Sequence, residues 1–198
     1  LEAMRGLADA APTLDRETFR RSAAPWMLDA PGLAALGLSE RVERADIGAF
    51  ELRERAASGD GFRIAERWPA GQAPADGDGL VVIRFVEPMA GNAAAVGVNA
   101  RSIPRAREAI DIATRSGRPA ATTGFTLTQG GPGVVVYQAL YRGEPTTEPA
   151  RQNQMRGVVF ATLRPDSLLP TLAQGLPTTL SLCLLDTGAA PGQRVLAA

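Results

Sequence analysis

The residues with the clearest chemical potential lie in one stretch, RFVEPMAGNAAAVGVNA, which covers residues 84–100. An apolar run leads into Glu87 and Pro88, and glycines, asparagines and a row of small residues follow. A carboxylate at the mouth of a cleft can act as a general acid, and a glycine-rich loop can cradle a phosphate group. The stretch therefore suggests two hypotheses, an acid–base catalyst and a phosphate-binding loop.

The spacing of the glycines argues against a phosphate-binding loop. A Walker-type loop has four residues between its two glycines and continues with lysine and then serine or threonine. Five residues separate Gly91 from Gly97, and no lysine follows. The GxGxxG pattern of dinucleotide-binding loops is absent as well. We therefore expect these glycines and alanines to let the backbone pass close beneath a helix.

Acid–base catalysis by Glu87 would need a second carboxylate, because glycosidic and similar chemistry uses a pair. Asp111 and Glu66 are candidates, but the spacing singles out neither. Pro88 has no N–H and so ends strand pairing, and Glu87 at a strand end can accept hydrogen bonds from loop amides. We expect Glu87 to have a structural role, and we do not expect this chain to be an enzyme.

The composition excludes several classes of function. The net charge of the 198 residues is zero, which gives no basic footprint for a nucleic-acid partner. Histidine is absent and cysteine occurs once, so His/Cys zinc sites and catalytic triads are excluded. We expect no cofactor and no metal. Cys183 lies in the apolar run TLSLCLLD, which predicts a buried thiol.

The composition also bears on membranes. The chain has no run of about 20 apolar residues that could span a bilayer, and no signal-peptide pattern opens it. Its first residues have the pattern of a helix already under way, and its last residues, RVLAA, have that of a strand. We expect an excised segment of a longer protein.

Hydrophobic periodicity predicts the elements. The first helix is expected over 1–10, and a second begins at an N-cap, Thr13 or Asp15, and bends at Pro25. A third is expected from about 43 to 58, with Ile47, Phe50 and Ala57 facing inward. A fourth is expected from a cap at Ser102 to Gly117, and a fifth over RPDSLLPTLAQG. Strands are expected in LAALGLSERV, FRIAER, GLVVIRFV, TTGFTLT, VVVYQALY, RGVVFATL, TTLSLCLLD and RVLAA. The segment QGGPG predicts a hairpin, hence antiparallel pairing and an α+β fold rather than a doubly wound sheet.

Several separated motifs occur in the order found in one family. They are RETFRR, PGLAALGLSERV, FELRERAASGDGFRI, RFVEP, GNAAAVGVN, AREAIDIATRSGRPAATTGFTL, and VVVYQALY with RGVVFATLRPDSLL. Together they resemble the CHASE domain, the extracytoplasmic sensory domain of receptor-like histidine kinases and nucleotide cyclases. The resemblance covers most of residues 1–186.

The resemblance implies an architecture. Residues 1–58 would form an N-terminal stalk and helices, and residues 59–164 a membrane-distal PAS-like domain with an antiparallel five-stranded sheet. Residues 165–198 would belong to a second, smaller PAS-like unit that is cut short, and part of 33–43 would join its sheet. The resemblance also implies homodimers through the N-terminal helices, two flanking membrane spans, a periplasmic location and a cytoplasmic catalytic output of histidine kinase or diguanylate cyclase type.

The resemblance also implies a small-molecule pocket. In the cytokinin-binding members an aspartate holds the purine, and that position falls near Ala106; pocket threonines fall on Tyr137 and Thr122. Without the carboxylate, and with the larger Tyr137, we do not expect cytokinin as the ligand. Asn99 stands where many members carry aspartate. The expected ligand-binding residues are Ala100, Ala106, Thr122, Leu127, Thr128, Tyr137, Met155 and Gly157.

Three functions remain open at this stage. The first is a ligand-sensing domain, whose pocket should be mostly apolar with a few polar groups. The second is a dimerisation or partner-interaction module without a ligand, which the alanine at position 106 favours. The third is an enzyme, which would need titratable groups converging in a cleft.

Overall fold

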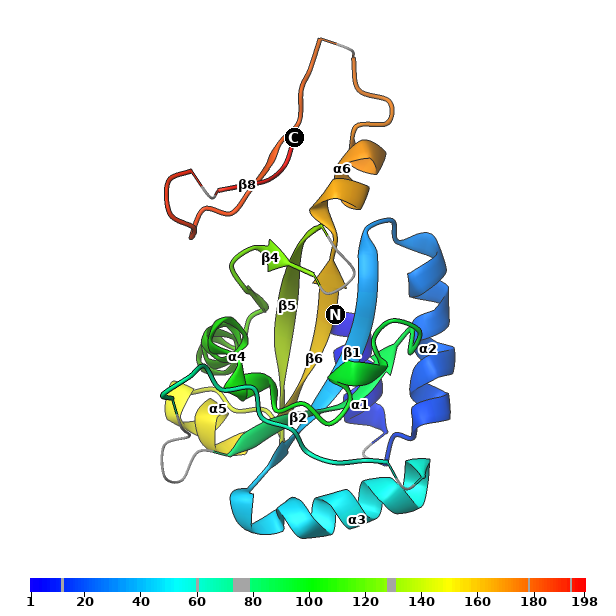
Figure 1. Ribbon diagram of the computed structural model, residues 1–198, viewed down its shortest axis with the longest axis vertical. Helices are drawn as coiled ribbons and strands as arrows, with labels where there is room; N and C mark the ends of the chain where they lie inside the picture. The colour runs from blue at the N-terminus through cyan, green and yellow to red at the C-terminus, as the bar shows by residue number, and fades with distance from the viewer. Residues whose placement is uncertain (12, 60, 73–78, 128–130, 178, 193) are drawn as a thin grey trace.

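The computed structural model describes residues 1–198 except 12, 60, 73–78, 128–130, 178 and 193. Its centre is a six-stranded sheet in which every pair of strands is antiparallel. The order is β2-β1-β6-β5-β3, and β4 also pairs with β5 (Figure 1). The strands are β1 Leu33–Val42, β2 Leu80–Glu87, β3 Ala120–Ala121, β4 Phe125–Thr126, β5 Pro132–Tyr141 and β6 Met155–Leu163. The α+β class is confirmed, and the PAS-like assignment stays a prediction.

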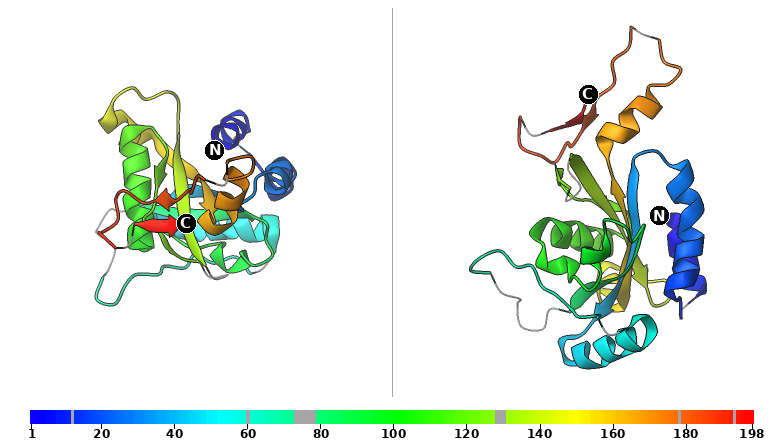
Figure 2. Two further views of the ribbon diagram at one scale, coloured as in Figure 1. Left: turned by 90° about the horizontal axis from the view of Figure 1, so that it is seen from above. Right: turned by 45° about the vertical axis from the view of Figure 1, so that its right-hand side comes forward.

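Helices cover both faces of this sheet. Helices α1 (Glu2–Ala10) and α2 (Arg16–Asp29) lie on one face, and α4 (Pro104–Ser116) lies on the other (Figure 2). Helix α3 (Ile47–Ser58) lies across the lower end of the sheet in Figure 1. Figure 1 also shows α5 (Glu148–Gln154) beside α4 and α6 (Pro165–Leu172) above β6. The sheet is thus the middle layer of the molecule.

Local signals place most helix ends where the sequence predicts them. Helix α1 ends at Ala10, and the carboxylate of Asp15 caps α2 by accepting a hydrogen bond from the Thr18 amide at 2.7 Å. Helix α2 continues through Pro25 to Asp29. Helix α4 ends at Gly117, whose φ of 72° is the left-handed conformation that glycine adopts without strain.

The predicted cap at Ser102 is wrong. Ser102 lies in the short 3-10 helix η3 (Ala100–Ser102) and is fully buried. Its hydroxyl donates to the Asn99 carbonyl and accepts from the Arg67 amide. The serine therefore joins the turn to the passing segment before β2 instead of starting α4.

Each sheet face has its own core. On the α4 side the buried cluster includes Val81, Ile83, Val98, Ile110, Val158 and Phe160. On the α1/α2 side it includes Met4, Phe19, Leu36, Phe85, Leu140 and Val159. Neighbouring residues of β6, Val158 and Val159, fall in different clusters because successive side chains of a strand point to opposite faces.

The structure corrects three strand predictions. Residues 62–67 make only an isolated bridge, between Ala65 and Val98, rather than a strand. Residues 33–42 form β1 in the middle of the main sheet, so they do not join a sheet with residues 165–198. The two runs at the end of the chain reduce to the pair β7 (Leu184–Leu185) and β8 (Val195–Ala197).

Two burial predictions are also wrong. Cys183 is exposed, because the run around it forms only the short strand β7 at the edge of the molecule. In α3, Ala57 is exposed and Glu54 is buried. The apolar pattern did not indicate Glu54, because its burial depends on arginines supplied by another strand as well as its own helix.

Candidate functional site

The stretch 84–100 contributes backbone contacts to the fold rather than catalytic groups. Strand β2 ends at Glu87, as predicted. The segment 97–99 lies between β2 and the chain at 63–65: the Ile83 amide donates to the Val98 carbonyl, and the Ala65 amide donates to the Gly97 carbonyl. Gly97 has a φ of 82°, and a Cβ there would run into the carbonyl of Arg63. The close approach is therefore to an extended segment, which corrects the expectation of a helix.

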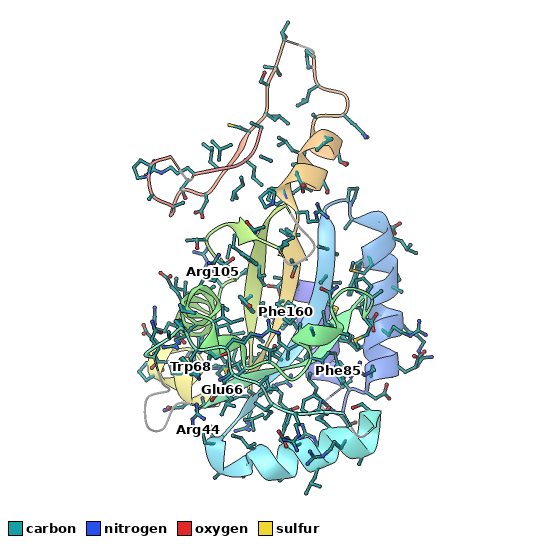
Figure 3. The ribbon with its side chains drawn as sticks, viewed as in Figure 1. Arg44, Glu66, Trp68, Phe85, Arg105 and Phe160 are labelled. Carbon is teal, nitrogen blue, oxygen red and sulfur yellow. The ribbon has the colours of Figure 1, made fainter. Side chains whose placement is uncertain are left out.

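The buried Asn99 and the more exposed Glu66 belong to one junction. The Asn99 side chain donates to Glu66 Oε1 at 2.8 Å and accepts from the amides of Val81 and Arg101. Glu66 also accepts from Arg44 at 2.9 Å (Figure 3). Partial burial tends to raise the pKa of Glu66, but the hydrogen bonds from Arg44 and Asn99 outweigh it and hold the pKa below its usual range. Asn99 thus has a structural role, because its side chain connects Glu66 with the backbone at Val81 and Arg101.

The carboxylates considered for catalysis have separate partners. Glu66 pairs with Arg44, whereas Asp111 pairs with Arg101 at 3.2 Å. Among the residues that the structure describes, no group of three or more His, Cys, Asp or Glu side chains could hold a metal ion. These contacts give the acid–base hypothesis no support.

Four of the eight expected ligand-binding residues lie together. Ala100, Ala106, Tyr137 and Met155 belong to one buried cluster between α4 and the sheet. They come from η3, α4, β5 and β6, so four separate elements converge there. Alanines at 106, 109 and 113 lie on the inner face of α4 together with Ile110, so three of the side chains that α4 turns toward the sheet are short.

The other expected residues do not join this cluster. Thr122 is buried beside β5, where its hydroxyl accepts from the Val135 amide at 3.1 Å. Leu127 packs over Gly133 in β5. Gly157 pairs with Leu140 and Glu40, and the alternation along β6 assigns it to the α1/α2 face. Thr128 lies outside the described residues.

Aromatic rings occupy the centre of the α4-side cluster. The rings of Tyr137 and Phe160 are 5.9 Å apart and tilted by 47°, and the Phe160 ring covers Gly37 of β1. Figure 3 shows Phe160 in the middle of the sheet. Burial alone raises the pKa of the Tyr137 hydroxyl far above its ordinary value. No described residue forms a hydrogen bond with that hydroxyl.

Sequence reasoning missed Ser39. Its cross-strand neighbours, Ile83 and Val158, belong to the α4-side cluster, so Ser39 faces the same side of the sheet as Tyr137. Ser39 is fully buried, and its hydroxyl has no hydrogen-bond partner among the described residues. A serine at an inward position of LAALGLSERV is the signal that could have indicated it.

The outer side of α4 carries arginines stacked on aromatic rings. Arg105 lies 5.0 Å from the Phe125 ring, and Arg107 lies 4.4 Å from the Trp68 ring. Such cation–π contacts fasten α4 to β4 and to the segment before β2. The helix is therefore held from its outer side as well as from the sheet.

The comparison with known families agrees with the motif order. The CHASE domain family model matches residues 12–196, nearly the whole chain. The chain belongs to the CHASE domain family. CHASE domains are extracytoplasmic sensory domains of signalling receptors, and they are not catalytic. No curated protein matches the chain significantly. Among its described residues, this CHASE domain has no helix with the length and apolar character needed to cross a bilayer.

Proposed function

We propose that this CHASE domain senses a small molecule bound between α4 and the sheet. The observation that supports this proposal best is the Ser39 hydroxyl, which is buried without a hydrogen-bond partner among the described residues and faces the same side of the sheet as the hydroxyl-bearing side chain of the buried Tyr137. A buried polar group without a partner costs roughly 1–3 kcal/mol. A ligand that supplies hydrogen bonds to these hydroxyls would recover that cost.

The geometry limits the size of such a ligand. Ser39 lies in β1 and Tyr137 in β5, with β6 between them and an offset of two residues in register, so the two positions are about 12 Å apart. The surrounding side chains are small at Gly37, Ala100 and Ala106 but large at Tyr137 and Phe160. The ligand therefore has to displace the aromatic rings, and bound and free domains would differ in how α4 packs on the sheet.

That difference is what a sensor requires. A ligand shifts a conformational equilibrium only by its difference in affinity for the two states. Movement of Phe160 and Tyr137 would shift strands β5 and β6. Leu140 and Val159 of the same two strands point to the opposite face of the sheet and pack against α1 and α2. In this proposal the domain is the periplasmic part of a bacterial receptor, forms a homodimer through α1 and α2, and controls a cytoplasmic histidine kinase or diguanylate cyclase.

A second candidate is a partner-interaction module with no ligand. The close packing of Tyr137 and Phe160, and the absence of a carboxylate at Ala106, favour it. The two candidates differ in one property, because only the sensor should gain stability from a metabolite.

A thermal-shift screen of polar metabolites of up to about 20 heavy atoms distinguishes them. We expect at least one compound to raise the melting temperature, and we expect its effect to fall in Tyr137→Phe or Ser39→Ala. Tyr141→Phe is the matched control, since the Tyr141 hydroxyl already donates to the carbonyl of Thr114 at 2.8 Å. No stabilising compound, or hits that respond to neither variant, would favour the interaction module.

A further inference from the structure

The β7–β8 pair meets the turn between β3 and β4 (Figure 1). The amide of Gly124, the last residue of this turn, donates a hydrogen bond to Asp186 Oδ2 at 3.1 Å. The Leu196 side chain lies directly over Gly124, because a Cβ at this position would run into Leu196 Cδ2. A polar contact and an apolar contact therefore meet at a single glycine.

The two residues that contact Gly124 belong to one small unit. The Asp186 amide donates to the Arg194 carbonyl at 2.7 Å, across the pair. Asp186 Oδ1 accepts a hydrogen bond from the Gly188 amide at 2.9 Å, within the turn that follows β7. Leu196 is the middle residue of β8. The carboxylate and the leucine therefore contact Gly124 together or leave it together.

The attachment of this unit is small. Among the described residues, the bond from Gly124 to Asp186 is the only hydrogen bond that joins residues 184–198 to the rest of the chain. Leu185 and Val195 of the pair are 50% and 63% exposed. A two-stranded pair is marginally stable by itself, and segments with few buried contacts open at the lowest free energies in a fold. We therefore expect the pair to exchange between a docked and a released state.

The turn on which the pair docks is also fastened to α4. Phe125 follows Gly124 directly and pairs with Gly133 of β5. The guanidinium of Arg105, in the first turn of α4, lies 5.0 Å from the centre of the Phe125 ring. Two neighbouring residues thus receive different elements: position 124 contacts the β7–β8 pair, and position 125 contacts the helix.

We propose that the β7–β8 pair is a releasable latch whose docked state depends on the position of α4. Movement of Arg105 would shift Phe125 and with it the Gly124 amide, and a hydrogen bond weakens steeply when its geometry changes. The coupling is reciprocal, so release of the latch would also loosen α4. The inference does not depend on the ligand site proposed beneath α4, because the contacts at Gly124 are made within the chain itself. A ligand that moved α4 would shift the same equilibrium.

Amide hydrogen exchange of the ¹⁵N-labelled domain measures release, because the Gly124 amide loses its acceptor when the latch opens. Leu196→Ala removes the apolar contact and should speed exchange of this amide by about tenfold. Val195→Ala is the matched control: Val195 is the neighbouring residue of β8 but is mostly exposed, so the rate should change by less than about twofold. Equal effects of the two variants would overturn the latch.

The Val159 amide, in the central strand β6, distinguishes release from general unfolding. Its exchange rate should be the same in Leu196→Ala as in the wild type, because release leaves the main sheet intact. Acceleration of the Val159 amide as large as that of the Gly124 amide would mean that the variant destabilises the whole domain, and would contradict a local latch.

A double-mutant cycle tests the dependence on α4. Arg105→Ala removes the stack on Phe125 and should also speed exchange of the Gly124 amide. Its effect combined with Leu196→Ala should differ by about threefold or more from the product of the single effects, because residues of one contact network are coupled. Arg115→Ala, at the other end of α4, is the control, and its combination with Leu196→Ala should match the product within about twofold. A simple product for Arg105→Ala as well would show that α4 and the pair act independently, and would overturn the proposal.

Discussion

Tyr137 and Tyr141 lie on the same strand, β5, but their hydroxyl groups have different surroundings. The Tyr141 hydroxyl donates to the carbonyls of Ala113 and Thr114, at 3.3 and 2.8 Å, and so ties β5 to the end of α4. The Tyr137 hydroxyl has no such partner, and burial raises its pKa. A hydroxyl with a hydrogen-bond partner stabilises the fold, whereas a buried hydroxyl without one destabilises it. The same chemical group therefore has opposite effects on stability at positions 141 and 137.

We predict that Tyr141→Phe lowers the free energy of unfolding by about 1 kcal/mol, the usual net contribution of a hydrogen bond. Tyr137→Phe should leave it unchanged or raise it slightly, because the variant removes a buried polar group that has no partner. Urea denaturation of the ligand-free proteins measures both changes. A larger loss for Tyr137→Phe than for Tyr141→Phe would show that the Tyr137 hydroxyl is bonded in the resting domain.

Glu66 gives the domain a defined dependence on pH. Its pKa in the folded chain lies below the ordinary value of 4.5, because the hydrogen bonds from Arg44 and Asn99 outweigh the effect of partial burial. A carboxylate with a lowered folded-state pKa stabilises the fold above its unfolded pKa, and this contribution is lost as the pH falls through the folded-state pKa.

We therefore predict that the stability difference between the wild type and Glu66→Gln is constant above about pH 5 and narrows as the pH falls further. Urea denaturation at a series of pH values measures this difference. A Glu66 carboxyl signal that titrates above 4.5 by NMR would contradict the assignment, since 4.5 is the ordinary value.

At the scale of single residues, the sequence predicted contacts between residues close together in the chain and missed contacts between distant segments. The Asp15 cap follows from its position at the start of one helix, and it is present. Asn99 could not be assigned from sequence, because its three hydrogen-bond partners come from separate segments. Ser39 was missed because the sequence of a strand does not show whether a buried serine hydroxyl will find a hydrogen-bond partner.

At the scale of elements, α3 is fastened to the sheet by a buried charge. Glu54 of α3 is only 3% exposed, and its carboxylate lies 2.8 Å from Arg84 of β2 and 3.1 Å from Arg53. Glu40 of β1 accepts a hydrogen bond from Arg53 at 2.9 Å and forms an ion pair with Arg84 at 3.5 Å. The four side chains join α3, β1 and β2 in a charge-balanced network.

We predict that Glu54→Ala lowers the free energy of unfolding by about 3 kcal/mol, because it leaves the partly buried Arg84 without its closest carboxylate. Glu43→Ala is the control: Glu43 pairs with Arg41 but is 52% exposed, so its loss should cost less than about 1 kcal/mol. Urea denaturation compares the two. Equal losses would mean that the network does not hold α3.

The helices and long strands could be predicted because each carries its own period and end signals. Part of strand β1 was expected to join the sheet of residues 165–198, yet β1 is a ten-residue central strand of the main sheet. Pairing with both β2 and β6 stabilises it, and such long-range pairing cannot be read from the local pattern. The opposite holds for 62–67, whose alternating pattern forms only one bridge.

At the scale of the whole molecule, the end of the chain extends beyond one end of the main sheet. Figure 1 shows α6 and the β7–β8 pair above the main body. Many of the exposed large apolar side chains lie here, including Leu172, Leu176, Leu180, Leu182, Leu185 and Val195. The sequence predicted strands in this part because apolar residues are frequent, but without a second layer to pack against they form only a short pair.

The family and the sheet together account for the sensory role. Motif order alone indicated the CHASE domain, and the family model confirms it over residues 12–196. The expected ligand contacts divide in the structure: part of the set lies beneath α4, whereas Gly157 belongs to the opposite face. Sequence spacing could not separate them, because bulges such as the one beside Tyr141 change which face a residue meets.

The most direct test of the central claim is an amide chemical-shift map of the ¹⁵N-labelled domain with the strongest hit from the metabolite screen. We predict the largest changes in α4, β5 and β6 around Ala106, Tyr137 and Phe160, with smaller changes across the sheet in α1 and α2. Changes confined to α1, α2 and α3 or to the outer surface, with α4 unaffected, would contradict ligand sensing beneath α4.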